Sequence, residues 1–568
     1  MKLKSILCAA TLLASAFAAP VAAQNFRDRL PEDEVIYFVL PDRFENGDVK
    51  NDKGGIKGDR LKHGFDPAHK GFYHGGDLTG LIKRLDYIQG MGITAIWFAP
   101  VFKNKPVQGA PGNESSGYHG YWVTDFTTID PHFGTDATFK TFVDAAHKRG
   151  MKVYMDIITN HSADVIQFEE CRNSSCAYRS PADYPDKAYT PFIPENEKRV
   201  KVPEWMNDPQ YYHNRGNTTF QPENELLGDF VGLDDFATAD PRVVDGFIDV
   251  YKGWIDRFGI DGFRIDTAKH VHPEFWQKFV PAITGHARSR GIPNFHIFGE
   301  VYADGIDIPL QAWHTKVAKL PTVIDFAFRR AAIDTVTGKA GTEILVNLFR
   351  GDAIYEGGVK TAQRLPTFLG NHDQGRFARE VRLAYPEASD DEILKRVVLG
   401  HAMLLTLRGV PTIYSGDEQG FAGDGNDQDA REDMFPSRVA IYNDNDLVGT
   451  DATTADSNFN RDHPLYRRIS ELARLRVGNV ALRRGEQIVR GFSAKPGLFA
   501  VSRIDRVSGE EVLIAFNTSN APLVANAEIG KSATGFTSLS GSCPATPRLP
   551  GSVAISLAPL SYMVCKVK

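Results

Sequence analysis

Three carboxylates stand at the ends of short apolar segments of this chain. Asp266 ends Gly-Phe-Arg-Ile-Asp, Glu300 ends His-Ile-Phe-Gly-Glu, and Asp373 ends Phe-Leu-Gly-Asn-His-Asp. A charge left unpaired beside a buried strand costs roughly several kcal/mol, so a structural role does not account for three such endings. Carboxylates can serve as nucleophiles and as general acids or bases. Because the carboxyl ends of parallel strands meet at one rim of a barrel, the three acids predict an enzyme.

Eight apolar segments with the length of strands alternate with longer segments of helical periodicity. We predict strands at 35–40, 93–101, 152–158, 322–327, 366–369 and 410–414, with two more that begin at Gly262 and Phe295. We predict helices at 78–90, 136–149, 242–258, 273–290 and 390–407. Strands that alternate with helices are typical of parallel sheets, and eight of them suggest closure. The predicted fold class is therefore α/β, with a (β/α)8 TIM barrel.

Two segments interrupt this alternation. The chain between the third and fourth strands is rich in Pro, Asn, Tyr and charge, and it is too long for an ordinary loop. We therefore predict a small domain inserted after strand 3. Near the C-terminus, short alternating segments separated by Gly, Asn and Pro indicate an all-β module. The predicted domains are a barrel at 24–161 and 235–481, an inserted domain B at 162–234, and a C-terminal β-sandwich at 482–568.

Residues 1–23 have the composition of a secretory signal peptide. Lys2 and Lys4 precede an apolar stretch, and small residues lead to a cleavage point before Gln24. No later segment approaches the ~20 apolar residues of a membrane helix. The formal net charge is −6 and there is no long basic cluster, which argues against nucleic-acid binding. We expect a secreted monomer, periplasmic or extracellular, without membrane attachment.

Four cysteines remain after the predicted cleavage, in two pairs that are local in sequence. Cys171 lies near Cys176, and Cys543 lies near Cys565. Four cysteines allow three pairings, and export to an oxidising compartment favours these two disulfides. A zinc site is the alternative, but the spacing between the pairs does not match the usual ligand spacing.

Several motifs of the chain resemble short sequence regions of the α-amylase family of glycoside hydrolases. They occur in the order of that family and at similar intervals, from about Val35 to the C-terminus. The four main motifs lie at 156–161, 262–270, 298–301 and 368–373, and two further segments lie at 117–122 and 409–418. One such motif is weak evidence, but six in order are strong evidence.

The resemblance implies how the three acids divide the work at a glycosidic bond. Asp266 is then the nucleophile that forms a glycosyl-enzyme, and Glu300 is the acid that later acts as a base. Asp373 corresponds to the third acid of the family, which binds sugar hydroxyls and helps to distort the ring. Double displacement of this kind retains the anomeric configuration.

Other residues of these motifs are expected to bind the sugar. Arg264 precedes Asp266 by two positions, so both side chains lie on one face of a strand, and the guanidinium should keep Asp266 ionised. The pKa of Glu300 should instead be raised, so that it can donate a proton. Taken singly, the arginine could be a structural ion pair and each histidine a core residue. The predicted substrate-binding residues are His119, Tyr121, His161, Arg264, Lys269, His270 and His372.

The resemblance also implies a structural calcium ion between the barrel and the inserted domain. Its expected ligands are Asn160, Asp235 and the backbone carbonyl of His270, and oxygen ligands of this kind suit calcium. The alignment leaves Asp234 as an alternative to Asp235, and the inserted-domain carboxylate is not identified. A zinc site at His270 and His272 is disfavoured, because alternate residues of one loop rarely form a complete site.

The expected substrate is an α-1,4-glucan such as starch, glycogen or a maltooligosaccharide. Lys269-His270 resembles the sequence of enzymes that cleave internal bonds, so an endo-acting α-amylase is the first choice. Transfer between maltooligosaccharides, and exo-acting hydrolysis of the cyclomaltodextrinase or α-glucosidase type, remain alternatives. A non-catalytic carbohydrate-binding protein on the same fold is a more remote one, since fold alone does not fix function.

Overall fold

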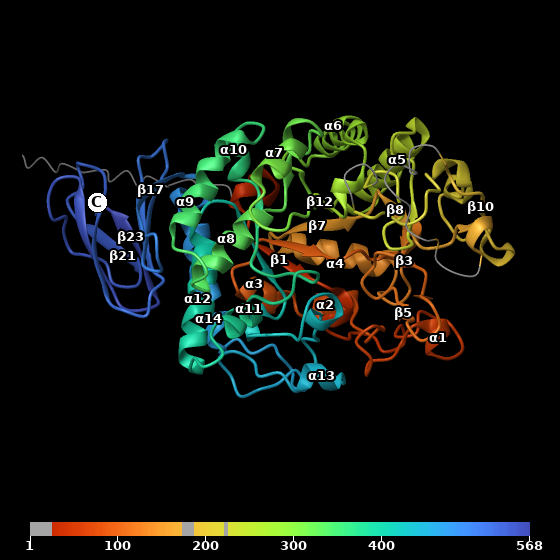
Figure 1. Cartoon of the computed structure of the whole chain (residues 1–568), viewed down its shortest axis with the longest axis horizontal. Helices are drawn as coiled ribbons and strands as arrows, with labels where there is room; N and C mark the ends of the chain where they lie inside the picture. The colour runs from red at the N-terminus through yellow and green to blue at the C-terminus, as the bar shows by residue number, and fades with distance from the viewer. Residues whose placement is uncertain (1–24, 173–175, 177–186, 221–224) are drawn as a thin grey trace, which may run out of the picture.

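Figure 1 shows the computed structural model of the chain, with a helix-rich body and a separate group of β-strands toward the C-terminus. It describes residues 25–172, 176, 187–220 and 225–568. The predicted signal peptide at 1–23 lies outside the described residues.

Eight parallel strands form the centre of the body. Their order around the sheet is β14-β13-β12-β7-β2-β1-β16-β15, and every pairing between neighbours is parallel. At the two open edges, the amide of Asp325, just after the last residue pair of β14, donates to the carbonyl of Pro366 in β15 at 2.8 Å and brings the edges together. The barrel is nearly closed, and the predicted fold class is confirmed. The strands are β1 (Ile36–Val39), β2 (Ala95–Phe98), β7 (Lys152–Ile157), β12 (Gly262–Ile265), β13 (His296–Gly299), β14 (Thr322–Val323), β15 (Pro366–Thr367) and β16 (Val410–Tyr414).

The helices of the body begin and end where the sequence supplies caps. In α5 the Asp240 side chain accepts from the amide of Arg242, Pro241 occupies the first turn, and Gly259 ends the helix with φ +70°. The main helices are α4 (Asp136–Lys148), α5 (Pro241–Phe258), α6 (Pro273–Ser289), α7 (Ile308–Lys316), α8 (Phe326–Val336), α11 (Phe377–Ala384), α12 (Asp390–Thr406) and α14 (Pro464–Gly478).

Two predicted elements differ from the structure. The single helix predicted at 78–90 is two helices, α2 (Leu78–Lys83) and α3 (Leu85–Gly90), which meet at Arg84. The strand predicted at 322–327 ends at Val323, because the Asp325 side chain accepts from the amide of Phe328 and starts α8 instead.

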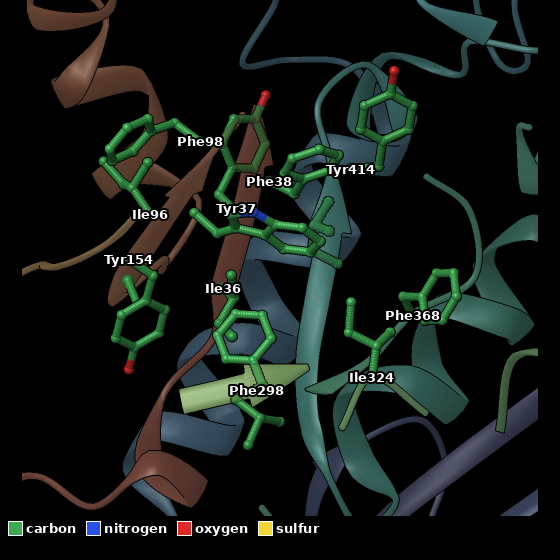
Figure 2. Close-up of a cluster of buried hydrophobic side chains, with 14 of the residues drawn as sticks. Ile36, Tyr37, Phe38, Ile96, Phe98, Tyr154, Phe298, Ile324, Phe368 and Tyr414 are labelled. Carbon is green, nitrogen blue, oxygen red and sulfur yellow. The ribbon is translucent and has the colours of Figure 1, made fainter. Parts of the chain in front are cut away.

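Aromatic side chains from several strands fill the barrel core (Figure 2). Phe38 stacks on Trp97 with ring centroids 4.0 Å apart and on Tyr414 at 5.5 Å, so three neighbouring strands meet through rings. Phe298 meets Trp97 edge-on at 5.6 Å. Rings that are fully buried each contribute roughly 1.5–3 kcal/mol, and they fix the strands that carry the acids.

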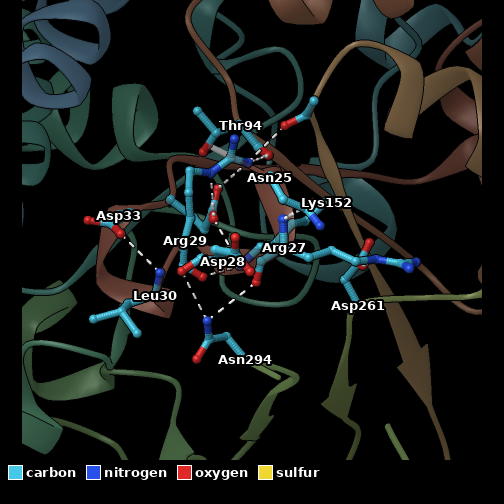
Figure 3. Close-up of polar contacts among 12 residues, drawn as sticks. Asn25, Arg27, Asp28, Arg29, Leu30, Asp33, Thr94, Lys152, Asp261 and Asn294 are labelled. Atoms are coloured by element: carbon cyan, nitrogen blue, oxygen red, sulfur yellow. Dashed lines mark hydrogen bonds and ion pairs between the residues drawn. The ribbon is translucent and has the colours of Figure 1, made fainter. Parts of the chain in front are cut away.

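The segment that begins at Asn25 ties together the amino ends of the strands (Figure 3). Arg27 donates to Asp261 at 2.9 Å, just before β12, and Asn294 donates to the carbonyl of Asp28 at 3.1 Å, just before β13. Arg29 donates to the carbonyls that precede β2 and β7, at Thr94 and Gly150. The barrel mouth opposite the three acids is therefore held by polar contacts.

Short antiparallel pairs follow β7. Strand β8 (His161–Ser162) pairs with β11 (Asp234–Asp235), and β9 (Gln167–Phe168) pairs with β10 (Pro191–Phe192). The predicted disulfide between Cys171 and Cys176 is present, and so is the one between Cys543 and Cys565.

The C-terminal part is an antiparallel β-region with its own apolar cluster. A five-stranded sheet and a separate two-stranded sheet enclose side chains that include Leu513, Val553 and Met563. No helix among the described residues is long and apolar enough to cross a membrane. The strands are β17 (Glu486–Phe492), β18 (Leu498–Ile504), β19 (Glu511–Asn517), β20 (Leu523–Glu528), β21 (Phe536–Ser540), β22 (Ser552–Leu557) and β23 (Ser561–Val567).

Candidate active site

Two of the three acids lie side by side at the carboxyl rim of the barrel. Strands β12 and β13 are paired in register up to Ile265 and Gly299, and the next residues are Asp266 and Glu300. The amide of Glu300 donates to the carbonyl of Ile265 at 2.8 Å and extends the ladder by one step. Parallel pairing therefore places both carboxylates at the same height on neighbouring strands.

One buried guanidinium joins these two acids. The Nη1 atom of Arg264 donates to Asp266 Oδ1 at 2.8 Å, and its Nη2 atom lies 2.8 Å from Glu300 Oε2. Arg264 is fully buried. The predicted ion pair between Arg264 and Asp266 is present, and it extends to Glu300.

A third carboxylate shares this arginine. Asp156, near the end of β7, accepts from Arg264 at 2.9 Å, from Trp97 Nε1 at 3.0 Å and from the Tyr121 hydroxyl at 3.1 Å. Sequence reasoning gave Asp156 no role of its own, although it opens the motif that contains His161. The structure assigns it to the polar layer beneath the two acids.

Burial sets the protonation of the acids. It raises the pKa of Glu300 to about 7, and the nearby carboxylates of Asp266 and Asp373 add to this while Arg264 opposes it. The pKa of Asp156 rises to about 8, again mainly through burial. Burial also raises the pKa of Asp266 from its ordinary value, although Arg264 opposes the shift. Glu300 has the raised pKa expected of an acid, and Arg264 limits the effect of burial on Asp266.

Asp373 approaches from a tight turn that follows β15. The side chain of Asn371 accepts from the amides of Asp373 and Gln374 at 3.0 and 2.7 Å. Arg431 donates to Asp373 Oδ1 at 3.0 Å and also pairs with Asp427 at 2.5 Å. Sequence reasoning missed Arg431 and Asp427. Their four-residue spacing, shortly after the last strand, is the signal that could have found them.

All three acids line one cavity of about 680 Å³. His119, Tyr121, His161, Lys269 and His270 line it as well. The other two predicted binding residues, Arg264 and His372, are fully buried and are not among the lining residues. Lining residues that sequence reasoning missed include Phe220, Phe230, Val231, Tyr302, Asp427 and Arg431.

The histidines surround Asp266 and Asp373. His161 Nε2 lies 4.0 Å from Asp266 Oδ2 and has no hydrogen-bond partner, so it can donate to a ligand. Burial lowers the pKa of His161 to about 3, which keeps the ring neutral. His372 Nε2 lies 2.9 Å from the Tyr121 hydroxyl and 3.3 Å from Asp373. His372 therefore supports the cavity wall from behind.

Lys269 and His270 connect the barrel to Glu225, on the segment between β7 and β12. Lys269 Nζ lies 3.3 Å from a carboxylate oxygen of Glu225, and His270 Nδ1 lies 3.0 Å from the Glu225 carbonyl. Lys269 also lies over the Tyr302 ring at 5.8 Å. These contacts build one wall of the cavity.

Two of the predicted calcium ligands, Asn160 and Asp235, lie on neighbouring paired segments. β8 and β11 are paired, and the amide of Phe236 donates to the carbonyl of Asn160 at 2.9 Å. The Oδ1 atoms of Asn160 and Asp235 are buried and have no hydrogen-bond partner. Burial alone raises the pKa of Asp235 well above its ordinary range. Two buried oxygens that lack a donor fit a hard cation. No cluster of three His, Cys, Asp or Glu side chains suited to a metal occurs among the described residues.

Replacement of Arg264 by Met should destabilise the protein strongly. Asp156, Asp266 and Glu300 would lose their shared cation inside the protein, and breaking a buried ion pair costs about 3–5 kcal/mol. The measurement is the free energy of unfolding by urea at neutral pH. The control is Arg467→Met, because Arg467 pairs with Asp462 at the surface, where such a pair contributes about 0–1 kcal/mol. Equal losses in the two variants would contradict the prediction.

Comparison with known proteins identifies the family. A family model described as "Alpha amylase, catalytic domain" matches residues 38–485. The chain belongs to the alpha-amylase family. An alpha-amylase of Streptomyces lividans is 43% identical over 513 residues, which cover 86% of this chain and 55% of that protein's own length. The chain thus spans about half the length of this relative.

Solved structures of alpha-amylase family enzymes share the fold. An alpha-amylase from Geobacillus thermoleovorans, solved in complex with acarbose, is 26% identical with a TM-score of 0.70, over 95% of this chain and 99% of that chain. A three-domain cyclomaltodextrin glucanotransferase, CldA, is 27% identical with a TM-score of 0.74, over 94% and 99% of the two chains. Both a hydrolase and a transferase of this family thus resemble the chain along nearly its whole length.

Proposed function

We propose that the protein is a secreted, retaining, endo-acting α-amylase that hydrolyses α-1,4-glucosidic bonds of starch, glycogen or maltooligosaccharides. The observation that carries the proposal is the single guanidinium of Arg264 that contacts both Asp266 and Glu300 beneath one cavity. Asp373 lines the same cavity. The arrangement supplies the two carboxylates that glycoside hydrolysis needs, together with a third that binds sugar hydroxyls.

In the first step Asp266 attacks the anomeric carbon while Glu300 protonates the leaving oxygen. The bond from the anomeric carbon to the leaving oxygen breaks, and an ester bond to Asp266 forms. The raised pKa of Glu300, about 7, keeps it protonated for this step near neutral pH. His161, Asp373 and Arg431 are placed to hold the sugar hydroxyls.

In the second step Glu300 acts as a base. It takes a proton from water, the water oxygen attacks the anomeric carbon, and the ester to Asp266 breaks. The glucan leaves with retained configuration, and Glu300 is again protonated. Arg264 stays paired with Asp266 and Glu300 through both steps, which keeps the two carboxylates aligned.

The test is the release of reducing sugar from soluble starch, followed by chromatography of the early products. An endo-acting hydrolase releases a range of maltooligosaccharides and lowers the size of the polymer early. Release of a single short product from chain ends would contradict the endo-acting part of the proposal. No release at all would contradict the hydrolase.

Transfer of the glycosyl group to another sugar is the second candidate, and the resemblance to CldA favours it. A glycosyl-enzyme can react with a sugar hydroxyl in place of water. Incubation with maltotriose separates the two activities. Glucose and maltose as the main early products support hydrolysis, whereas products longer than maltotriose support transfer.

We propose that a calcium ion joins the barrel to the segment between β7 and β12. The buried Oδ1 atoms of Asn160 and Asp235 would hold it, with the backbone carbonyl of His270. The ion would supply the positive charge that these oxygens lack, and its role is structural.

Export is proposed as well, and the two disulfides support it, since such bonds persist in oxidising compartments.

Removal of calcium should lower the melting temperature. An ion that binds only the folded state stabilises it by about 2.7 kcal/mol at a hundredfold excess over Kd. The measurement is the melting temperature in calcium and in a chelator, with Asp235→Ala as the variant that should lose the response. An equal melting temperature of the wild type in both conditions would contradict the calcium proposal.

A further inference from the structure

Two loops at the rim are joined by two ion pairs of opposite polarity. Asp373 in the first loop pairs with Arg431 in the second, at 3.0 Å. Three residues later, Arg376 in the first loop pairs with Glu432 in the second, at 2.9 Å. Each loop therefore supplies the carboxylate of one pair and the arginine of the other. Arg376 and Glu432 have no role in the mechanism given above.

Both members of the second pair are buried, whereas in the first pair only Arg431 is. The side chains of Arg376 and Glu432 are each 1% exposed, whereas that of Asp373 is 37% exposed toward the cavity. Arg376 also donates to the carbonyl of Ser415 at 2.7 Å and to Asp417 at 3.1 Å. The buried pair therefore anchors both loops to the end of β16.

The turn between the two pairs is held by close contacts. Asn371 and Gly375 are bridged, and the Asn371 side chain accepts from the amide of Asp373. Gly375 has φ +82°, and a Cβ there would lie 2.8 Å from the carbonyl of Gly425 in the second loop. Only glycine permits this close approach. A displacement at Arg376 therefore passes directly to Asp373.

We infer that Arg376 and Glu432 are positioning residues, which hold the Asp373 carboxylate and the Arg431 guanidinium in register across the cavity. The inference rests on the proposed function, in which Asp373 binds and distorts the sugar at the cleavage point. It also gives a role to Asp417, which follows the last strand and contacts Arg376. An error of about 1 Å in such a group can cost roughly 10²-fold in rate.

The test is Glu432→Gln, which keeps the shape of the side chain and removes its charge. The matched control is Asp352→Asn. Asp352 is also a buried carboxylate that pairs with a buried arginine, Arg408, at 2.7 Å, and it does not line the cavity. Both arginines keep a second carboxylate, Asp417 or Asp325. Glu432 accepts one hydrogen bond from Arg376 and Asp352 accepts three from Arg408, so the control variant loses at least as many contacts as Glu432→Gln.

We expect kcat on a maltooligosaccharide to fall about 10- to 100-fold in Glu432→Gln, with KM changed less than threefold. The control should keep the kcat and KM of the wild type, although its melting temperature falls by at least as much as that of Glu432→Gln. Binding of acarbose should weaken in parallel with kcat, while binding of maltose stays unchanged. If the pair had only a structural role, Glu432→Gln would lower the melting temperature without a selective fall in kcat.

A second variant guards against misfolding. Arg376→Lys keeps the charge that faces Glu432 and should retain more activity than Arg376→Met at equal folded fraction. If Glu432→Gln and Asp352→Asn have equal kcat and KM, the inference is overturned even though the wild type hydrolyses starch. If the wild type does not hydrolyse starch, the proposed function fails first, so the two failures are distinct.

Discussion

Asp266→Asn should lower kcat/KM on soluble starch by about 10⁵-fold, because the amide cannot form the glycosyl ester. The loss is large because the proposed mechanism depends on a single nucleophile. Glu300 lies against the same guanidinium and has the role of the acid in the proposed mechanism. The measurement is reducing-sugar release at matched protein concentration.

The same variant should keep its fold. Asp266 shares Arg264 with two other carboxylates, and the charge of Asp373 opposes its ionisation. Loss of the Asp266 charge therefore relieves repulsion while Arg264 stays paired. We expect a melting temperature equal to or above that of the wild type. If the rates of the wild type and Asp266→Asn agree within tenfold, Asp266 is not the nucleophile.

Glu300→Gln should lower kcat on starch by about 10³-fold, because general acid catalysis contributes about 10²–10⁴. The loss in kcat/KM, which reports the first step, should be much smaller on an aryl maltotrioside whose phenolate leaves without a proton, whereas kcat stays low because the second step still lacks its base. A missing acid lowers the rate of the first step only when the leaving group needs a proton, whereas a misplaced nucleophile lowers it on both substrates. An equal loss in kcat/KM on both substrates would contradict the role of Glu300.

The pH profile gives a second readout of Glu300. Its pKa of about 7 is above the ordinary value, so the protonated form is present below pH 7 and is lost as the pH rises through 7. Wild-type kcat/KM should therefore fall on the alkaline side with a midpoint near pH 7. In Glu300→Gln this alkaline limb should be absent.

The positions of Asp266 and Glu300 could be predicted because they depend on local patterns. Each follows an apolar strand directly, and parallel strands end at the same rim, so strand pairing brings the two acids together. Arg264 could be predicted for the same reason, since the period of a strand puts it on the face of Asp266.

The other wall of the site depends on contacts between distant loops. Arg431 reaches Asp373 from a segment 58 residues away, and no sequence period links the two. Phe220, Phe230 and Tyr302 line the cavity because their segments fold over the rim. Such contacts are set by tertiary packing, whereas the strand ends are set by the local chain.

One predicted strand boundary was wrong because a helix cap follows directly after the apolar residues. The segment at 322–327 is apolar enough for a strand, but Asp325 caps α8 and ends β14 at Val323. The same residue closes the barrel through its amide, which contacts Pro366. One residue thus sets both features, the strand end through its side chain and the closure through its backbone amide.

The most direct measurement of the central claim is the mass of the protein after incubation with α-maltotriosyl fluoride. In Glu300→Gln the fluoride leaves without an acid, but no base assists the second step, so the glycosyl-enzyme should accumulate. We predict a mass increase of one maltotriosyl group on the peptide that contains Asp266. Consumption of the fluoride without any adduct, or an adduct on a different residue, would contradict the account.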